Sequence, residues 1–167
     1  MKVRLLIVWG LLIVPLWTNA QGLDRKLEKM ATELATKLDT KSVGKVAIWG
    51  FVQEEKKDNP LGALLTEDFS IHLMDKAESF SVLERYQLTT LLKEHGLNDD
   101  GYINEKTAKE LGKFVAADAV VVGSYTILRT EIKLRIKVLD TETALQITGI
   151  SGSLPITPNI ARKLGRL

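Results

Sequence analysis

An unbroken apolar run at residues 119–122 is the strongest feature in the pattern of hydrophobic and polar positions. The run follows directly on a helical stretch and consists of an alanine and three valines in succession. Successive side chains of a strand point to opposite faces, so this strand is apolar on both faces and must be covered on both. The pattern therefore predicts that residues 119–122 form the central strand of a sheet.

Upstream of this run, helical and strand patterns alternate. Residues 24–38 have apolar side chains at spacings of three and four, which predicts an amphipathic helix that docks on the sheet. Asn59-Pro60 is a typical helix start, because a capping side chain precedes a proline. We expect the remaining upstream elements to be a strand at 45–52, a helix to about residue 76, a strand at 80–83, a helix ending at Gly96 and a helix at 105–114.

The strand predicted at residues 45–52 is apolar on both faces. A regular alternation places Val46 and Ile48 on one face, and Trp49 and Phe51 on the other. Both faces are therefore expected to be covered, as in the central strand.

Downstream of the central run the period changes to two. Apolar and charged side chains alternate over residues 131–138, which predicts a strand with one face in water. A last strand is expected at 144–154, and tight turns between these strands make this part an antiparallel meander. The tail contains another helix start, Thr157-Pro158, but too few residues follow to bury much.

The order of elements, α-β-α-β-α-α-β-β-β, predicts an α/β fold of the α+β type. Strands separated by helices can lie parallel, whereas strands joined by tight turns are antiparallel. We therefore expect a mixed sheet of about five strands with helices packed on it.

The first residues resemble a secretory signal peptide. Lys2 and Arg4 precede an apolar run that is too short to cross a bilayer comfortably, and small residues stand at Thr18 and Ala20, where signal peptidase reads them. We expect cleavage after Ala20; the alternative is an uncleaved N-terminal anchor. The chain thus divides into a signal peptide (1–20), an N-terminal helix and linker (21–44), an α/β domain (45–154) and a C-terminal tail (155–167).

Composition excludes several classes of protein. The chain has no cysteine, which excludes disulfides, thiol chemistry and the lipid-bearing cysteine of bacterial lipoproteins. It has 23 basic and 21 acidic residues, and two of the basic residues lie in the leader, so the mature chain is formally neutral. Charges of both signs are interspersed, which is typical of a solvated surface and disfavours nucleic acid binding.

Four regions of the sequence, in this order and at these distances, resemble one known family. They are KVAIWGFV followed by NPLGALLTEDFSIHL, then VLERYQLTTLLKEHGL, then LGKFVAADAVVVGSYT, and finally IKVLDTETALQITG. These regions, within residues 45–149, are similar to the family of curli-secretion proteins (CsgG) and flagellar outer-membrane proteins (FlgO). The resemblance implies a fold related to the N-terminal domain of TolB and to the lipoprotein activators of penicillin-binding proteins.

The resemblance also implies a class of function. Members of the family are non-enzymatic cell-envelope proteins that dock onto each other as rings, onto peptidoglycan synthases or around the flagellar base. We therefore expect an exported protein, periplasmic or associated with the outer membrane, with protein partners in the envelope or copies of itself. No cofactor, nucleic acid partner or lipid anchor is expected, and membrane contact is at most peripheral. The chain departs from the family in lacking the lipidated cysteine and long amphipathic hairpins, and in having Gly50 where proline is common.

Candidate catalytic and metal-binding residues are few. The two histidines, His72 and His95, lie in helical segments, and we interpret both as structural. Residues 98–103 imitate the middle of a calcium loop, but its first and twelfth positions fall on Gly96 and Thr107, where carboxylates are needed. No motif for a catalytic triad, zinc or phosphate is present. We therefore assign no catalytic, cofactor-binding or metal-binding residue.

Arg85 is the charged residue with the clearest expected role. It directly follows a buried strand, and the similar family also places an arginine there. We expect Arg85 to form a structural ion pair with Glu94 or Asp118. As an interaction surface we expect Tyr102, Tyr125 and the edge of the last strand.

Two functions from different classes remain open. The first is a non-catalytic envelope assembly protein that docks to protein partners. The second is a small secreted enzyme, such as a hydrolase, that uses carboxylates which no motif identifies; Glu84, Asp99 and Asp118 are the candidates. An enzyme requires a concave pocket with titratable groups of shifted pKa, whereas a docking protein requires an exposed patch or an open sheet edge.

Overall fold

The computed structural model describes residues 20–53, 60–83, 88, 90, 94 and 105–164. The helices and strands in these ranges are α1 (Ala20–Asp39), β1 (Lys45–Gln53), α2 (Pro60–Lys76), β2 (Ser81–Leu83), α4 (Glu105–Val115), β3 (Ala119–Ile127), β4 (Glu131–Asp140), β5 (Gln146–Pro155) and α5 (Pro158–Lys163). Every element predicted in these ranges is present, with bounds that differ by a few residues. None of the described helices is both long and apolar enough to cross a membrane.

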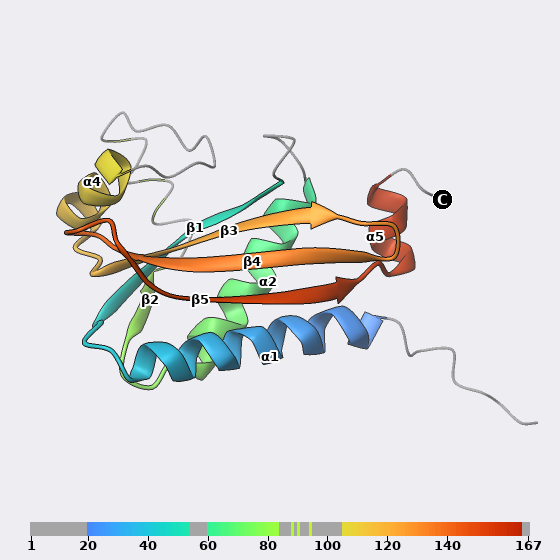
Figure 1. Ribbon diagram of the computed structural model, residues 1–167, viewed down its shortest axis with the longest axis horizontal. Coiled ribbons are helices and arrows are strands. Elements are labelled where there is room, and N and C mark those ends of the chain that lie inside the picture. Colours follow the sequence, from blue (N-terminus) through green and yellow to red (C-terminus); the bar gives the residue numbers. More distant parts are fainter. Residues whose placement is uncertain are drawn as a thin grey trace, which may run out of the picture.

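The strands form one mixed, five-stranded sheet in the order β2-β1-β3-β4-β5 (Figure 1). β1 pairs in parallel with β2 and β3, and the connections between these strands contain helices. β3, β4 and β5 are antiparallel and follow one another through short turns. The predicted mixed sheet and antiparallel meander are confirmed, and the valine-rich run is the middle strand, β3.

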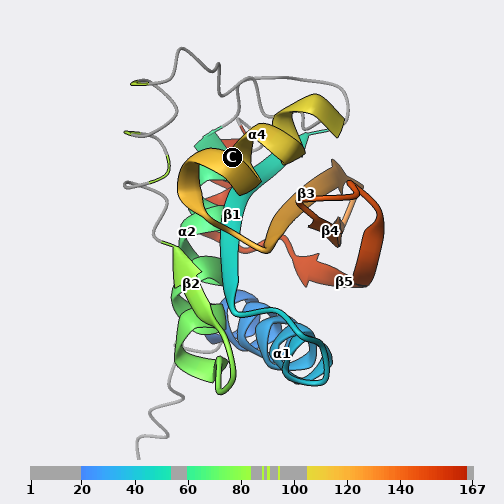
Figure 2. The ribbon, with the colours of Figure 1, turned by 90° about the vertical axis from the view of Figure 1, so that its left-hand side faces the viewer.

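The apolar side chains of β3 belong to two separate clusters, one on each face of the sheet. Val121 lies in the larger cluster, beneath α1 and α2. Val120 lies in a smaller cluster with Leu88 and with residues of α4. Figure 2 shows α4 across one end of the sheet. Both faces of the central strand are therefore covered, as the sequence predicts.

The helices at the two ends of the described chain both pack on this body. α1 buries one stripe completely, which confirms the predicted docking; its members are Leu27, Ala31, Leu34, Ala35 and Leu38. In α5, the Thr157 side chain accepts the N–H of Ile160 and caps the helix. The expectation that the C-terminal tail buries little is wrong, because Ile160 is 1% exposed.

β1 departs from regular alternation at one point. Ile48 pairs with Val121, but Gly50 pairs with Val122, so Trp49 is an extra residue in this strand. Gly50 has a φ of 139°, a conformation that glycine adopts readily because it has no Cβ. The bulge turns Phe51 onto the same face as Val46 and Ile48, so the predicted placement of Phe51 with Trp49 is wrong.

Two glycines make room around Phe51: Gly123 on the neighbouring strand β3, and Gly62 on α2. The Phe51 ring lies over Gly123, where a Cβ would come within 2.2 Å of the ring, and it packs against Phe69 at 5.3 Å between ring centroids. A Cβ on Gly62 would come within 2.3 Å of the Phe51 carbonyl oxygen. Thr66 Oγ1 accepts the Phe51 N–H at 2.9 Å, which joins α2 to β1 at the bulge.

Tyr125 faces the helices and is not on the surface. Its side chain is 0% exposed and lies in the same cluster as Val121, because the two positions are four residues apart on one strand. The prediction that Tyr125 belongs to an interaction surface is therefore wrong. Burial raises the pKa of Tyr125 to about 12.

Replacing Val121 by aspartate should abolish cooperative folding. The side chain is fully buried and would carry a charge without a partner. Such a charge costs several kcal/mol, against a total stability of about 5–15 kcal/mol for a typical domain. We expect Val121→Asp to show no cooperative thermal transition by circular dichroism, whereas Thr130→Asp, in an exposed turn, melts as the wild type does. A normal melt for Val121→Asp would remove β3 from the core.

Two helical glycines should respond to alanine in opposite directions. Gly62 and Gly22 are each the third residue of their helix, but a Cβ at Gly22 meets only Pro155 Cγ, at an ordinary 3.6 Å. Gly62→Ala should cost about 1–3 kcal/mol through overpacking, and Gly22→Ala should cost nothing or stabilise by up to about 1 kcal/mol. Urea unfolding midpoints at unchanged slope measure both values. Equal midpoints would show that α2 and β1 are not in close contact.

The buried phenol of Tyr125 should make the protein sensitive to alkali. In the unfolded chain a tyrosine loses its proton near pH 10, whereas the folded-state pKa is about 12. The unfolded state therefore binds fewer protons between these values, and stability falls as pH rises through this window. Wild type should lose up to roughly 2–3 kcal/mol more than Tyr125→Phe between pH 9 and 12. Parallel curves of unfolding free energy against pH for the two proteins would exclude this linkage.

Candidate functional site

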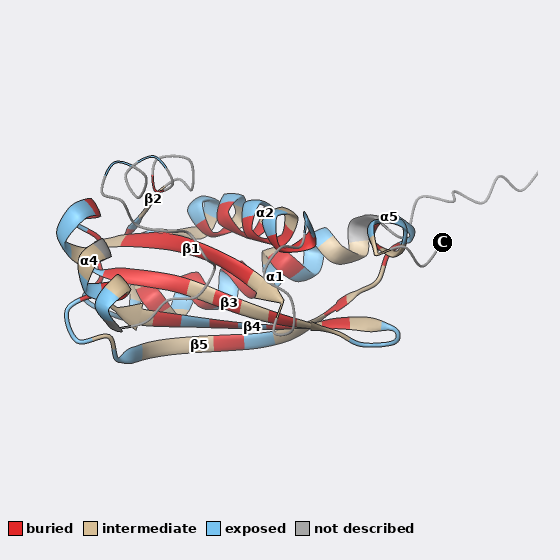
Figure 3. Ribbon diagram, turned by 90° about the horizontal axis from the view of Figure 1, so that it is seen from above, coloured by how far each residue is buried: buried red, intermediate tan, exposed pale blue. Residues whose placement is uncertain are grey.

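One face of the sheet is left largely uncovered by the described helices. α1 and α2 cover the opposite face, and α4 covers only the end near Trp49 and Val120. In Figure 3, β1 is buried along most of its length, whereas β5 is mostly intermediate or exposed. We call the uncovered part the outer face. Its residues are Ser124, Thr126, Lys133, Arg135, Lys137, Gly149, Ser151 and Ser153.

Three basic residues of β4 dominate the outer face. Ile132, Leu134, Ile136 and Val138 point into the core, so the residues between them point outward. The strand register places each basic residue between small or short side chains of the neighbouring strands. These cross-strand sets are Thr126, Lys133 and Ser153; Ser124, Arg135 and Ser151; and Val122, Lys137 and Gly149.

The basic row consists of Lys133, Arg135 and Lys137. Their Cα atoms are about 7 Å apart along the strand. Arg135 Nη1 donates to Thr126 Oγ1 at 3.3 Å, and neither Lys133 nor Lys137 forms an ion pair with a described residue. β4 contributes one acid to the same face, Glu131 at its start. A positive patch bordered by small residues results, and such a patch attracts negatively charged partners.

No motif in the sequence singles out this row. Alternating charged residues predict a wet face of a strand, which is correct, but most wet faces have no partner. The available signal was that the strand has three bases and one acid on that face. The small residues on both sides become evident only when the strand register is known.

The residues predicted for an ion pair are only partly described. Arg85 lies outside the described residues, so its pairing with Glu94 or Asp118 stays a prediction; Glu94 is exposed. Asp118 Oδ2 accepts the backbone N–H groups of Gly44 and Lys45, each at 2.8 Å. Asp118 therefore holds the start of β1 against the start of β3. Of the predicted surface tyrosines, Tyr125 is buried and Tyr102 lies outside the described residues.

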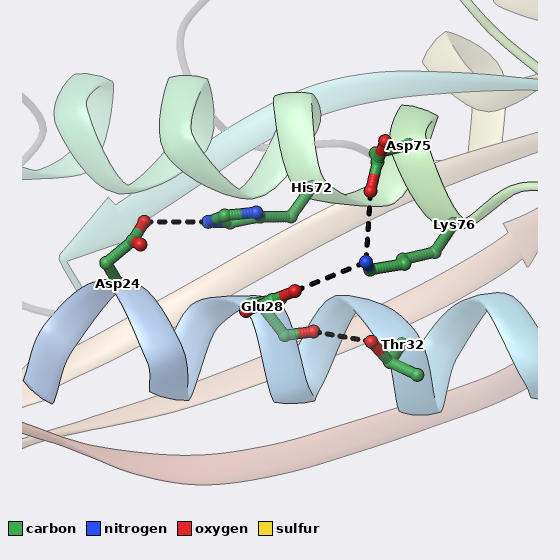
Figure 4. Close-up of polar contacts among 6 residues, drawn as sticks. All are labelled: Asp24, Glu28, Thr32, His72, Asp75 and Lys76. Carbon is green, nitrogen blue, oxygen red and sulfur yellow. Dashed lines mark hydrogen bonds and ion pairs between the residues drawn. The ribbon is translucent and has the colours of Figure 1, made fainter. Parts of the chain in front are cut away.

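His72 links the two helices on the covered face. Its Nε2 lies 2.8 Å from Asp24 Oδ1, and one turn further along Lys76 Nζ lies 3.2 Å from Glu28 (Figure 4). Burial raises the pKa of Asp68 on the same helix, and the charge of Asp24 adds to this shift. These contacts join α1 to α2 in a surface network, so the structural interpretation of His72 is supported. His95 lies outside the described residues.

A groove at the end of α4 is lined by Asp118, one of the candidate catalytic carboxylates, and by further acidic residues. It has a volume of about 630 Å³, and its lining includes Asp118 and Asp140. Asp140 Oδ1 accepts the N–H groups of Glu142 and Thr143 and the Thr143 hydroxyl, and these bonds lower the Asp140 pKa. A carboxylate of lowered pKa is a poor general base at neutral pH.

Two further sets of candidate residues lie outside the described ranges. They are the alternative catalytic carboxylates Glu84 and Asp99, and the calcium-like segment 98–103. The described residues include no cluster of histidine and acidic side chains that could hold a metal ion.

Three solved structures are similar in fold to this chain. The C-terminal domain of LpoB from Salmonella enterica has a TM-score of 0.62 at 14% identity, over 80% of this chain and 98% of that chain. LpoB of Escherichia coli, solved by NMR, has a TM-score of 0.60 at 15% identity, over 92% of this chain and 83% of that chain. Lipoprotein GNA1162 from Neisseria meningitidis has a TM-score of 0.54 at 15% identity, over 70% of this chain and 83% of that chain. At such identities the likeness shows a shared fold.

Comparison at the level of sequence gives the family. No curated protein matches the chain. The family model described as the curli production assembly/transport component CsgG matches residues 34–143, which is more than half of the chain and includes β1, α2, β2, α4, β3 and β4. The resemblance seen in four regions of the sequence is thus confirmed, and the protein belongs to the CsgG family.

Proposed function

We propose that this protein is an exported, non-catalytic component of the cell envelope that docks to another envelope protein through its outer face. Membership of the CsgG family supports an envelope role, and the leader pattern supports export. The observation that carries the docking is the basic row, which lies on the solvent side of β4 and is not needed to cover the core; Lys133 and Lys137 form no ion pair with a described residue.

The chemistry of the outer face favours an acidic protein surface as the partner. Three aligned cations attract a negatively charged surface from a distance and set its orientation. The neighbouring serines, threonine and glycine are small, so a partner can approach the backbone closely. No large apolar side chain lies on the outer face, which disfavours insertion into a membrane.

The role of the basic row can be tested by reversing its charges. A Lys133→Glu, Arg135→Glu, Lys137→Glu variant and the wild type are immobilised and used to capture proteins from envelope fractions at low and high salt. We expect wild type to retain an envelope protein at low salt, and the variant to bind it roughly tenfold more weakly or not at all. Thermal melts of both proteins should coincide, because the substituted side chains are on the wet face.

A matched control separates the row from general charge effects. Lys26→Glu, Lys29→Glu, Arg162→Glu changes net charge by the same amount, at exposed positions of α1 and α5. This control should capture the same protein as the wild type. Equal capture by the outer-face variant, or turnover of a substrate by the purified wild type, would overturn the proposed function.

A further inference from the structure

β5 is the long free edge of the sheet. It pairs with β4 on one side, and no described strand lies on its other side; the opposite edge strand, β2, has only three residues. Proteins usually protect exposed edges with charged residues, prolines or bulges. β5 has no charged residue in its ten positions, and its irregularities are confined to its ends, a bulge at Ile147 and the terminal Pro155. Within the strand itself, residues 149–153 therefore carry none of these protections.

A contact from α1 shows which backbone groups of β5 face outward. Lys37 Nζ donates to the Gly149 carbonyl at 3.2 Å, so this carbonyl points away from β4. In an antiparallel strand the N–H and C=O groups of every second residue point to the same side. Ser151 and Ser153 therefore also present theirs outward, and Pro155, which has no N–H, falls on the same side. Among the described residues, the Lys37 bond is the only one found at these outward groups.

A groove lies beside this edge. It has a volume of about 470 Å³ and is lined by Lys37 of α1, by Arg135 and Lys137 of β4, and by Gly149 and Ser151 of β5, among others. An extended chain in this groove would have β5 beside it, α1 below it and the ends of the basic side chains above it.

The charge of the groove is unequal on its two sides. Lys37 is already paired with Glu33 at 2.8 Å. Lys137 has no ion pair with a described residue, and it is exposed on the outer-face side of the edge. An added strand would thus meet an uncompensated positive charge on one of its two faces.

We propose that residues 149–153 bind an extended segment of a partner protein as an added strand, and that this segment carries acidic side chains at alternate positions. The proposal rests on the docking function above and names the chemistry of the partner. The added strand lies about 10 Å from β4, two strand spacings away. Because Gly149 and Ser153 are small, the Lys137 and Lys133 side chains opposite them can reach over β5 and meet carboxylates on the added strand.

A second copy of this chain is a less suitable occupant of the edge. Pairing of β5 with β5 of another copy would bring no acidic residue to the basic row, because β5 has none. It would also place two basic rows on one continuous face. Charge complementarity therefore favours a different, acidic strand.

Synthetic peptides test strand addition without knowledge of the natural partner. The full mature chain is titrated with a capped peptide of alternating glutamate and valine, with its lysine-valine counterpart, and with the glutamate-valine peptide carrying N-methylated backbone amides. We expect only the first to bind, with an affinity roughly tenfold or more above the other two. Hydrogen exchange measured by NMR should slow at the outward amides of Ser151 and Ser153 and stay unchanged at Ile150 and Gly152, which face β4.

Two protein variants complete the test. Lys137→Glu should weaken binding of the acidic peptide roughly tenfold, and Ser151→Pro, which removes one outward N–H, should abolish it while leaving the melt unchanged.

Binding of the N-methylated peptide as tightly as the parent peptide, or unchanged exchange at Ser151 and Ser153, would overturn strand addition. So would a peptide-free dimer in which these amides are already protected. Strand addition can fail by any of these outcomes while envelope capture still depends on the basic row. In that case docking through the outer face stands and the edge does not take part.

Discussion

The burial of both faces at the start of β3 is the constraint on which the rest of the structure depends. Val120 and Val121 point to opposite faces of the sheet, so each face needs its own cover. α1 and α2 supply one layer, and α4 supplies a shorter one that ends near Val122. Beyond this point the outward residues of β3 are Ser124 and Thr126, which need no apolar cover. The change from valine to hydroxyl side chains within one strand therefore sets the boundary between the buried part of the sheet and the outer face.

This boundary separates the residues that stabilise the fold from those available for a partner. The larger cluster contains the inward side chains of β4, whereas the outward ones share the strand but not the core. Charges on the outer face can therefore be selected for recognition at little cost in stability. The same logic applies to β5, whose Ile150 and Leu154 are buried while Ser151 between them is exposed. Sheet edge and basic row form one continuous surface around β5.

Much of the fold could be predicted from the sequence, because the long periodic segments have only one consistent interpretation. The valine run, the helical stripe of α1 and the two-residue period of β4 are each several residues long, and the structure confirms them. Single positions were harder to place. The face of Phe51 depends on a bulge at Trp49 and Gly50, and a bulge leaves no periodic signal. Tyr125 was misplaced because an aromatic residue near a strand end suits either an interface or a core.

The candidate site was less accessible than the fold for a physical reason. A docking surface is defined by side chains that come from different strands, so its pattern exists only across the sheet. Lys137 beside Gly149 is a feature of register, and register is set by the turn and the bulge that join β4 to β5. Arg85 and Tyr102 were chosen from local context alone, and the described residues do not include them.

The two core clusters also give the protein a built-in pair of optical reporters. Trp49 is the single tryptophan in residues 20–167, and it is 1% exposed in the cluster beneath α4. Tyr125 lies in the other cluster, beneath α1 and α2. Tryptophan fluorescence therefore reports on the cluster beneath α4. Tyrosine absorbance at alkaline pH includes a contribution from Tyr125 in the cluster beneath α1 and α2. A spectroscopist can use the unlabelled chain to see which side of the central strand opens first.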